Sequence, residues 1–346
     1  MDPVTSAAAA EDMAWLALDD ASAAGAARRA TERLADRLGM PAARVAEVGL
    51  AVTEIATNVH RHAGAGALLL RSVRTGTAAA LEVVAVDNGP GIPDLTAARR
   101  DGHSTAGTLG IGLGSIDRLA DALDISSAPG RGTVLVARFE ARRVAAPGSD
   151  STGPDAAGIT RALSGETVCG DAYAVRGDGP RMSLMVCDGS GHGPLAAAAA
   201  REAVRAFNDP GHPVSPEMAV RRIHRVLSGT RGAAVAVAEL DAAAGLVHFA
   251  GVGNIAGAVV SGGDKRSMVS IGGVAGYRDP TIRTFRYSLP PGSVVVLHSD
   301  GVRARWAAAE LGGVLGRSPL MIAATLLRDA GVRQDDACVL VGRARR

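Results

Sequence analysis

Isolated acidic residues at turns between apolar stretches are the most informative feature of this 346-residue chain. Asp188 stands in the segment Asp-Gly-Ser-Gly-His-Gly, Asp300 follows an apolar run, Asp335 precedes another, and Asp171 begins a further predicted strand. Hard divalent cations prefer such carboxylates, and the turn at Gly189 exposes a backbone carbonyl that can join them. Two cations lower the pKa of a water that they share, so this set predicts metal-dependent hydrolysis of a phosphoester.

Two neighbours of these acidic residues have roles that the sequence leaves open. His192 stands two residues after Ser190 in a glycine-bounded turn. It is either a general acid for the leaving group or a turn histidine that bonds to the backbone. Asp336 directly follows Asp335, so it is a second candidate for holding the same cation.

The first half of the chain contains a different set of polar residues. Glu54 and Asn58 are four residues apart in a helical stretch, so both side chains project from one face. The Asn58 amide oxygen can hold Mg²⁺, and the Glu54 carboxylate can orient or deprotonate an attacking hydroxyl. Asp87 ends an apolar strand before an Asn-Gly-Pro-Gly turn. Its carboxylate can accept a hydrogen bond from an exocyclic amine, which suits adenine.

A glycine-rich segment follows and opens a helix at Gly107, Gly110, Gly112 and Gly114. Unobstructed amide groups at a helix N-terminus bind phosphate oxygens, so we expect a triphosphate here. The spacing does not match the GxGxxG fingerprint of Rossmann folds, and no acidic residue follows at the required distance. A Walker lysine is also missing from the sequence.

The elements that must position these residues indicate two α+β domains. Helical spacing covers 14–38, 42–63 and a stretch from Gly114 to residue 122, and strands are expected at 67–74, 80–86 and 133–141. We expect a disordered tail at 1–11, a first domain at 12–141, a flexible connector at 142–158 and a second domain at 159–346. In the second domain, strands are expected at 166–169, 171–175, 181–187, 233–240, 246–251, 256–261, 293–298 and 337–341, with helices at 194–207, 216–227 and 319–330.

Composition and charge narrow the classes of function. The 346 residues are 47 % hydrophobic, enough for two packed cores. Lys and Arg (37) nearly balance Asp and Glu (35), so neither nucleic acid nor an anionic membrane is expected as a partner. The three cysteines form no CxxC pair, which argues against a disulfide framework or a zinc site. With no membrane-length apolar run and no signal peptide, a cytoplasmic protein is expected.

The motifs of the first half occur in the order and spacing of a known family. They are EIATNVHRHAGAG (54–66), VDNGPGIPD (86–94) and LGIGLGSIDRLADALDISSAPGRGT (109–133). Together they resemble the GHKL (Bergerat-fold) ATPases, and among these the anti-sigma-factor and stressosome switch serine kinases. The resemblance covers about 12–140 and implies that Glu54 is the general base, that Asn58 is the Mg²⁺ ligand and that Asp87 recognises adenine. It further implies nucleotide contacts from Gly89, Gly91, Gly110, Gly112, Gly114 and Thr133.

The second half resembles the PP2C-like phosphatases of the sporulation stage II E (SpoIIE) type, including the stressosome feedback phosphatase. The likeness lies in CGDAYAV (169–175), VCDGSGHGPLAAAAA (186–200), GVGN (251–254), PPGSVVVLHSDGV (290–302) and QDDACVLV (334–341). It implies two Mn²⁺ or Mg²⁺ ions and places a ligand at Asp335, the first of the paired acids. Ala337-Cys338 is a departure, because relatives commonly carry a Thr soon after that pair.

The two resemblances together imply a bifunctional regulator of a bacterial sigma-factor partner-switching pathway. An ATP-dependent serine/threonine kinase domain and a metal-dependent phosphatase domain would both act on STAS-domain phosphoproteins, with a sigma factor or a phosphatase as a further partner. Two alternatives remain open at this point. In one, the first domain only binds ATP or sequesters a sigma factor or its antagonist without phosphotransfer. In the other, the chain is a metabolic ATP-dependent enzyme with a small-molecule substrate.

Overall fold

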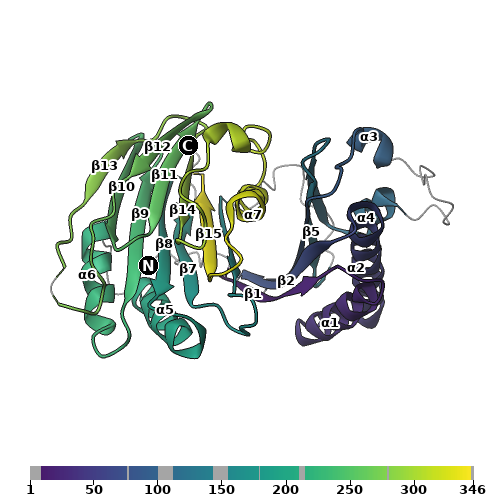
Figure 1. Cartoon of the computed structure of the whole chain (residues 1–346), viewed down its shortest axis with the longest axis horizontal. Coiled ribbons are helices and arrows are strands. Elements are labelled where there is room, and N and C mark those ends of the chain that lie inside the picture. Colours follow the sequence, from purple (N-terminus) through teal and green to yellow (C-terminus); the bar gives the residue numbers. More distant parts are fainter. Residues whose placement is uncertain are drawn as a thin grey trace. The chain divides into compact units, whose positions relative to one another are not determined.

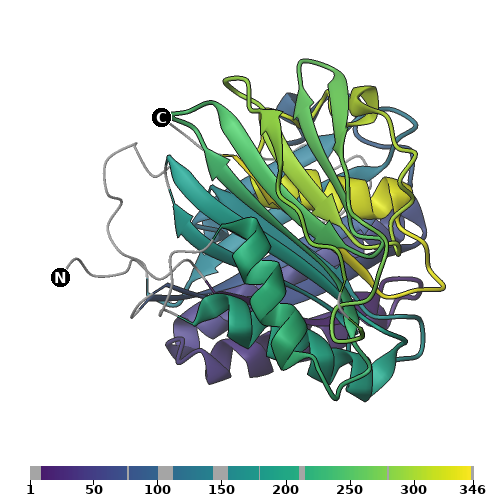
Figure 2. The same ribbon diagram turned by 90° about the vertical axis from the view of Figure 1, so that its left-hand side faces the viewer.

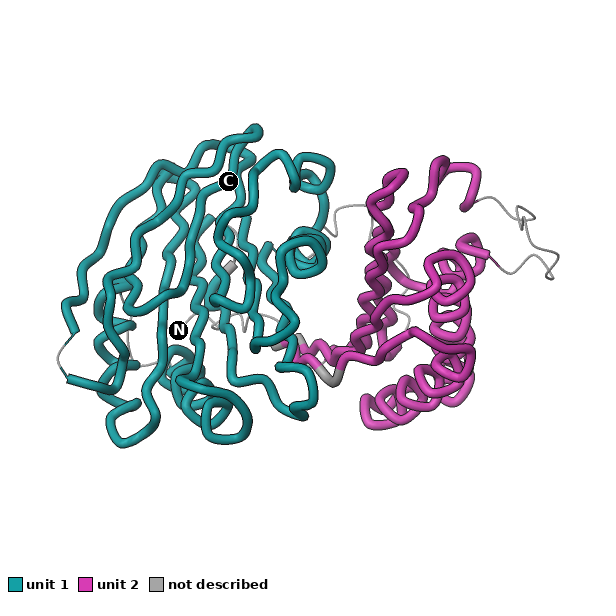
Figure 3. The backbone as a smooth tube through the Cα atoms, viewed as in Figure 1, with its two compact units in different colours: residues 1–7, 153–346 teal, residues 8–152 magenta. Residues whose placement is uncertain are grey.

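The computed structural model of the chain divides into two compact units (Figures 1 and 3). One lies within Ala8–Thr152 and the other within Gly153–Arg346, so the division falls inside the connector expected at 142–158. The domain boundaries proposed from the sequence stay predictions. The structure describes residues 9–75, 78–99, 112–142, 155–178, 180–209, 215–278 and 280–343.

The N-terminal unit is a five-stranded antiparallel sheet with helices packed on one face (Figure 1). The strand order is β1-β2-β3-β5-β4. The strands are β1 (Ala9–Ala17), β2 (Gly66–Thr75), β3 (Ala78–Asp87), β4 (Ala122–Ser127) and β5 (Thr133–Glu140). The helices are α1 (Ala23–Arg37), α2 (Ala42–Ala63), the short α3 (Leu95–Ala98) and α4 (Leu113–Leu119).

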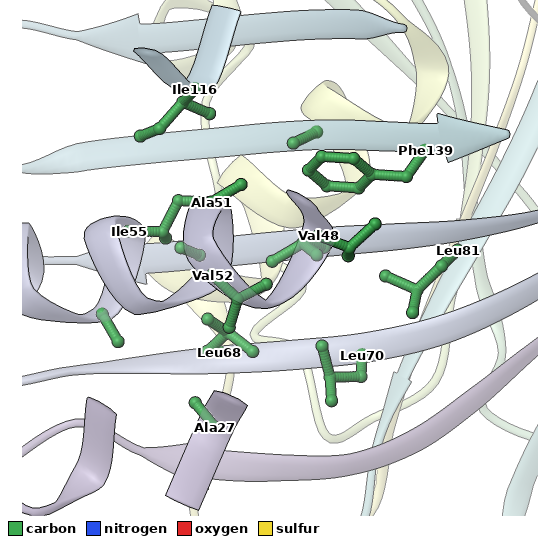
Figure 4. Packing of buried hydrophobic residues seen from close by; sticks show 14 of the residues in the cluster. Ala27, Val48, Ala51, Val52, Ile55, Leu68, Leu70, Leu81, Ile116 and Phe139 are labelled. Atoms are coloured by element: carbon green, nitrogen blue, oxygen red, sulfur yellow. The ribbon is translucent and has the colours of Figure 1, made fainter. Parts of the chain in front are cut away.

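Helix α2 forms the centre of the core of this unit (Figure 4). Val48, Val52 and Ile55 recur at helical spacing, so one face of α2 meets the sheet, where Leu68 and Phe139 are also buried. Burying each of these side chains contributes about 1.5–3 kcal/mol. The core therefore holds α2 rigidly against the sheet, and with it the polar residues on another face of this helix.

The beginning of this unit differs from the sequence-based prediction. The helix expected over 14–38 starts only at Ala23, because residues 9–17 form the edge strand β1, which pairs antiparallel with β2. The tail expected at 1–11 overlaps this strand. The alanine-rich sequence favours a helix locally, but β2 offers a row of backbone partners that the local pattern cannot reveal. Strand β4 is likewise absent from the prediction, which continued a helix to residue 122.

The C-terminal unit consists of two five-stranded sheets packed face to face, with helices outside both (Figures 1 and 2). The sheet orders are β13-β10-β9-β8-β7 and β12-β11-β14-β15-β6. Helices α5 (Gly193–Asn208) and α6 (Pro216–Val226) cover the first sheet, and α7 (Pro319–Ala330) covers the second. The strands are β6 (Ala156–Arg161), β7 (Asp171–Asp178), β8 (Arg181–Gly189), β9 (Ala233–Asp241), β10 (Leu246–Val252), β11 (Ala256–Ser261), β12 (Asp264–Met268), β13 (Phe285–Ser288), β14 (Val294–His298) and β15 (Ala337–Gly342), and a 3₁₀ turn spans Ala308–Leu311.

Two apolar layers hold this unit together. Leu184, Phe249 and Leu297 belong to the layer between the sheets, while the alanines of α5 pack with the helix-facing side of the first sheet. Helices α6 and α7 each begin with serine followed by proline, and the serine oxygens accept hydrogen bonds from backbone amides three residues on. These sequence signals explain why the predicted starts of both helices agree with the structure.

The predicted fold class, an α+β chain with a GHKL sandwich followed by an α-β-β-α sandwich, is confirmed. Residues 166–169 are not a strand, however, and β6, β12 and β13 are absent from the prediction. All three described cysteines are free thiols, as the sequence indicated. Among the described residues, no helix combines the length and the apolar character needed to cross a membrane.

Candidate functional sites

Asp87 organises the candidate nucleotide site at the end of β3. Its Oδ1 accepts hydrogen bonds from the backbone amides of Gly89 (2.9 Å) and Thr133 (3.1 Å), and the residue is only 8 % exposed. The carboxylate therefore has a defined orientation, set by the turn after β3 and by the start of β5. Two oxygens give a carboxylate about four acceptor positions, so the group retains capacity for an amine donor.

Glycines around Asp87 allow backbone segments to approach closely. A Cβ at Gly132 would lie 2.1 Å from the Asp87 carbonyl oxygen, and one at Gly91 would lie 2.1 Å from the Ala128 carbonyl oxygen. Both glycines also have positive φ, 69° and 73°, which L side chains rarely adopt. A Cβ at Gly89 would lie 2.5 Å from that of Ala63, at the end of α2. Only glycine fits at these positions, and this packing joins the Asp87 turn to α2.

Glu54 and Asn58 lie on α2, as the sequence predicted, and both are half-buried. Burial raises the pKa of Glu54, while a hydrogen bond with the Asn58 side chain lowers it in part. A carboxylate with a raised pKa is a better proton acceptor once ionised, which suits the general-base role proposed for it. Their hydrogen bond also places the amide and the carboxylate next to one another.

The predicted glycine segment is described only in part. Gly110 lies outside the described residues, as does Gly107. Gly112 is the residue before the first turn of α4, with open space around its Cα, and Gly114 is buried within the helix. The structure thus brings Gly89 and Thr133 into contact with Asp87. It leaves the contact between the glycine segment and a triphosphate as a prediction.

The C-terminal unit contains a cavity of about 690 Å³ to which three predicted acidic residues contribute. Asp188 lies at the end of β8, Asp300 follows β14, and Asp335 precedes β15. The strand ends converge because the two sheets pack face to face, so residues far apart in sequence line one hollow. Gly189 follows Asp188 and touches α5, where a Cβ would lie 2.3 Å from the Ala196 carbonyl oxygen.

Asp335 and Asp336 have different surroundings. The Asp336 side chain is 3 % exposed, and its two oxygens accept hydrogen bonds from the backbone amides of Leu163 (2.7 Å) and Gly170 (2.9 Å). Asp335 lines the cavity. Asp336 therefore connects three backbone segments, whereas Asp335 faces the cavity. This difference supports the proposed assignment of the cation ligand to Asp335.

Asp171 is buried on the strand next to Asp188 and is not among the residues that line the cavity. It pairs with Asp188 across β7 and β8, and it is 5 % exposed. Its Oδ2 accepts a 2.6 Å hydrogen bond from the Ser299 hydroxyl, whose oxygen in turn accepts the amide of Cys338 at 2.9 Å. Desolvation and the nearby Asp188 carboxylate raise the Asp171 pKa well above its usual range.

Mutual repulsion among the acidic residues indicates a site for positive charge. Burial, together with the negative charges of the Asp300 and Asp335 carboxylates, raises the pKa of Asp188 to about 7. Within the described residues, no three histidine, cysteine or acidic side chains are already grouped as ligands of one ion. Mg²⁺ usually retains several waters and takes only one or two carboxylates, so the donor set still fits hard cations.

The structure adds Asn254 as a functional candidate that the sequence did not single out, and it gives His192 a partner. The Asn254 side-chain amide donates a 2.6 Å hydrogen bond to Asp300 Oδ2, and both residues line the cavity. Asn254 stands in the GVGN segment, which was a usable signal. His192 also lines the cavity, and its Nδ1 lies 2.8 Å from a Glu166 carboxylate oxygen. The partner of His192 is therefore a carboxylate and not the backbone.

Comparison with known proteins matches the two units to two families. Residues 17–139 match the histidine kinase-like ATPase domain, and residues 178–345 match stage II sporulation protein E (SpoIIE). The serine/threonine-protein kinase RsbT of Bacillus subtilis (strain 168) is 37 % identical over 112 residues, which are 32 % of this chain and 84 % of RsbT. The phosphoserine phosphatase RsbX of the same organism is 23 % identical over 182 residues, 51 % of this chain and 88 % of RsbX.

A solved structure extends these matches. It is described as "The bacterial stressosome: a modular system that has been adapted to control secondary messenger signaling", and it is 31 % identical with a TM-score of 0.51. The match covers 55 % of this chain and the whole of that chain. The chain therefore belongs to the histidine kinase-like ATPase family through an RsbT-like N-terminal domain, which is fused to a C-terminal PP2C-like phosphatase domain of the SpoIIE family.

Proposed function

We propose that this chain both phosphorylates and dephosphorylates STAS-domain proteins of a bacterial partner-switching or stressosome module. Similarity to RsbT and RsbX supports the two opposed activities. The observation that carries the phosphatase assignment is the meeting of Asp188, Asp300 and Asp335 at one cavity from three separate strand ends.

In the phosphatase unit, Asp171, Asp188, Asp300 and Asp335 would hold two divalent cations, with the Gly189 carbonyl as a further oxygen. Such cations, when bound, supply a water of lowered pKa and positive charge that stabilises the reacting phosphoryl group. The protein's own contribution is orientation. Asn254 fixes the Asp300 carboxylate through its 2.6 Å hydrogen bond.

His192, which lines this cavity, would transfer a proton to the leaving group. Its side chain is 61 % exposed, and Glu166 holds its Nδ1, so Nε2 remains available toward a substrate. A proton delivered from Nε2 to the leaving seryl oxygen would complete the hydrolysis.

In the N-terminal unit, the hydrogen-bonded Asp87 carboxylate and the glycines around it support ATP binding. Asn58 would hold Mg²⁺ against the phosphates. Glu54, beside it on α2, would accept the proton of a partner's serine or threonine hydroxyl as that oxygen attacks the terminal phosphate.

Single-site variants of the full chain separate the two activities. With radiolabelled ATP and a STAS-domain protein, the Asp188→Ala variant should transfer label to serine or threonine without removing it. With the labelled STAS protein, Mn²⁺ and no ATP, the Asn58→Ala variant should release inorganic phosphate. Tight ATP binding without transfer to any STAS protein would instead show that the N-terminal unit is a binding module.

A further inference from the structure

Three exposed side chains lie together beside the phosphatase cavity without a role in holding cations. Val274 lines the cavity and is 39 % exposed, and Tyr277 is 55 % exposed. Both side chains flank Gly232, where a Cβ would lie 2.7 Å from Val274 Cγ1 and 2.8 Å from Tyr277 Cδ2. Arg231 is the residue immediately before Gly232. Arg231, Val274 and Tyr277 are called the recognition rim below.

The segment that carries Val274 and Tyr277 is anchored through its backbone. Ala275 exchanges hydrogen bonds of 3.0 and 2.8 Å with Ala233 at the start of β9, and Ile271 donates to Gly251. The Gly276 amide donates to His224 Nδ1 on α6 at 3.0 Å. Because these hydrogen bonds hold the segment in place, little conformational entropy of the segment is lost when a ligand covers the two exposed side chains.

Arg231 places positive charge beside a cavity to which the carboxylates of Asp188, Asp300 and Asp335 contribute. Its guanidinium Nη1 lies 3.2 Å from the position of a Cβ on Gly191, which itself lines the cavity. Within the described part of the chain, this guanidinium has no hydrogen-bond or ion-pair partner. A guanidinium recognises phosphate through paired N–H donors, and here it can do so without first giving up another contact.

We propose that the recognition rim binds the phosphorylated segment of the protein substrate, an inference that rests on the phosphatase function proposed above. Arg231 contacts the phosphate, and Val274 with Tyr277 contacts an apolar side chain next to the phosphorylated residue. Charge complementarity and continuity with the catalytic cavity favour this occupant, since an anchored apolar surface beside a free guanidinium matches a phosphate flanked by an apolar side chain. The substrate class is therefore a phosphoserine or phosphothreonine segment with an apolar neighbour.

Two phosphoserine peptides that differ only in their flanking residues, leucine in one and asparagine in the other, test this inference with the full chain. The wild type should favour the leucine peptide in kcat/KM by about tenfold, the value of burying one apolar side chain. Tyr277→Ala should reduce this ratio to about one. Arg231→Gln should raise KM for both peptides by a similar factor, about tenfold to a hundredfold, and leave the ratio intact.

Matched controls come from residues outside the cavity lining. Met218→Ala removes an apolar side chain of similar exposure (54 %), and Arg205→Gln removes a surface arginine that pairs with Glu202. Both controls should keep the wild-type ratio and KM. An unchanged peptide ratio in Tyr277→Ala together with an unchanged KM in Arg231→Gln would overturn the inference. Loss of self-association in Tyr277→Ala at a constant ratio would also overturn it and assign the rim to a second copy of this chain.

A binding measurement separates failure of this inference from failure of the phosphatase function. The affinity of a labelled phosphonate analogue of the leucine peptide is measured by fluorescence anisotropy without added metal. If the wild type hydrolyses neither peptide but the rim variants weaken this binding, the rim is supported and the proposed reaction is wrong. If hydrolysis proceeds and the rim variants alter neither affinity nor KM, the reaction is supported and the rim is wrong.

Discussion

The Ser299 hydroxyl donates a 2.6 Å hydrogen bond to the carboxylate of Asp171, although 128 residues separate the two in sequence. Both residues are buried, and Asp171 pairs with Asp188 on the neighbouring strand. The contact fixes the Asp300 loop, which begins at Ser299, against β7, whose Asp171 pairs with Asp188 on β8. Ser299 thus acts as a positioning residue between two of the proposed cation ligands.

Replacing Ser299 by alanine should therefore weaken cation binding by the phosphatase unit. We expect the Mn²⁺ concentration for half-maximal phosphatase activity to rise about tenfold to a hundredfold, the usual cost of losing a residue that orients metal ligands. A Mn²⁺ titration of activity measures this shift. Ser293→Ala is the control, because that hydroxyl donates to the Pro290 carbonyl oxygen within a turn. Equal shifts in the two variants would show that Ser299 has no specific role in the site.

The two sites should respond independently to mutation. Asp188→Ala should abolish metal-dependent phosphatase activity and leave the dissociation constant for ATP within about twofold, since Asp188 and the nucleotide site belong to separate compact units, each with its own core. Asn58→Ala should have the reverse effect, because it removes the proposed Mg²⁺ ligand from α2 alone. Isothermal titration with ATP gives the dissociation constant, and a phosphopeptide assay gives the phosphatase activity, for each variant. A variant that impairs both activities to the same degree would contradict independent sites.

Gly132 and Gly130 offer a matched pair of substitutions in the nucleotide site. Their φ angles, 69° and 73°, are nearly equal, so alanine at either position costs a similar backbone strain of about 1–2 kcal/mol. Only Gly132→Ala places a Cβ 2.1 Å from the Asp87 carbonyl oxygen, whereas the space around Gly130 is open. We expect Gly132→Ala to lose ATP binding and Gly130→Ala to retain it, as measured by titration. Equal ATP affinities would mean that the Asp87 turn can shift without consequence.

Phe139 should be a major contributor to the stability of the N-terminal unit. It is fully buried among the residues of Figure 4. Phe139→Ala should lower the free energy of unfolding of this unit by about 3–5 kcal/mol, from lost apolar burial and the cavity left behind. Leu50→Ala, at a position 46 % exposed on α2, should change it by less than about 1 kcal/mol. Urea unfolding followed by an ATP-binding signal reports on this unit.

The local sequence pattern was enough to predict an element whose own residues show the periodicity of that element. Helix α2 has the predicted bounds, 42–63, because its apolar residues recur at helical spacing. The local sequence pattern failed where pairing with another strand decides the conformation. An example is β1, an alanine-rich stretch that becomes a strand only because β2 lies beside it. The short edge strand β13 was missed for the same reason, since its partner β10 lies much earlier in the chain. The edge strand β12 was missed although it pairs with β11 across the local Gly262-Gly263 turn.

For the candidate sites, too, some features could be predicted from local sequence and others depended on the tertiary structure. From the sequence alone, the spacing of Glu54 and Asn58 and the acidic turns at Asp188 and Asp300 identified the residues that could do chemistry, because residue type and period are local properties. Only the tertiary structure placed Asp336 in backbone hydrogen bonds and Asp335 at the cavity. Convergence of strand ends depends on how two sheets pack, and that packing is a property of the whole core.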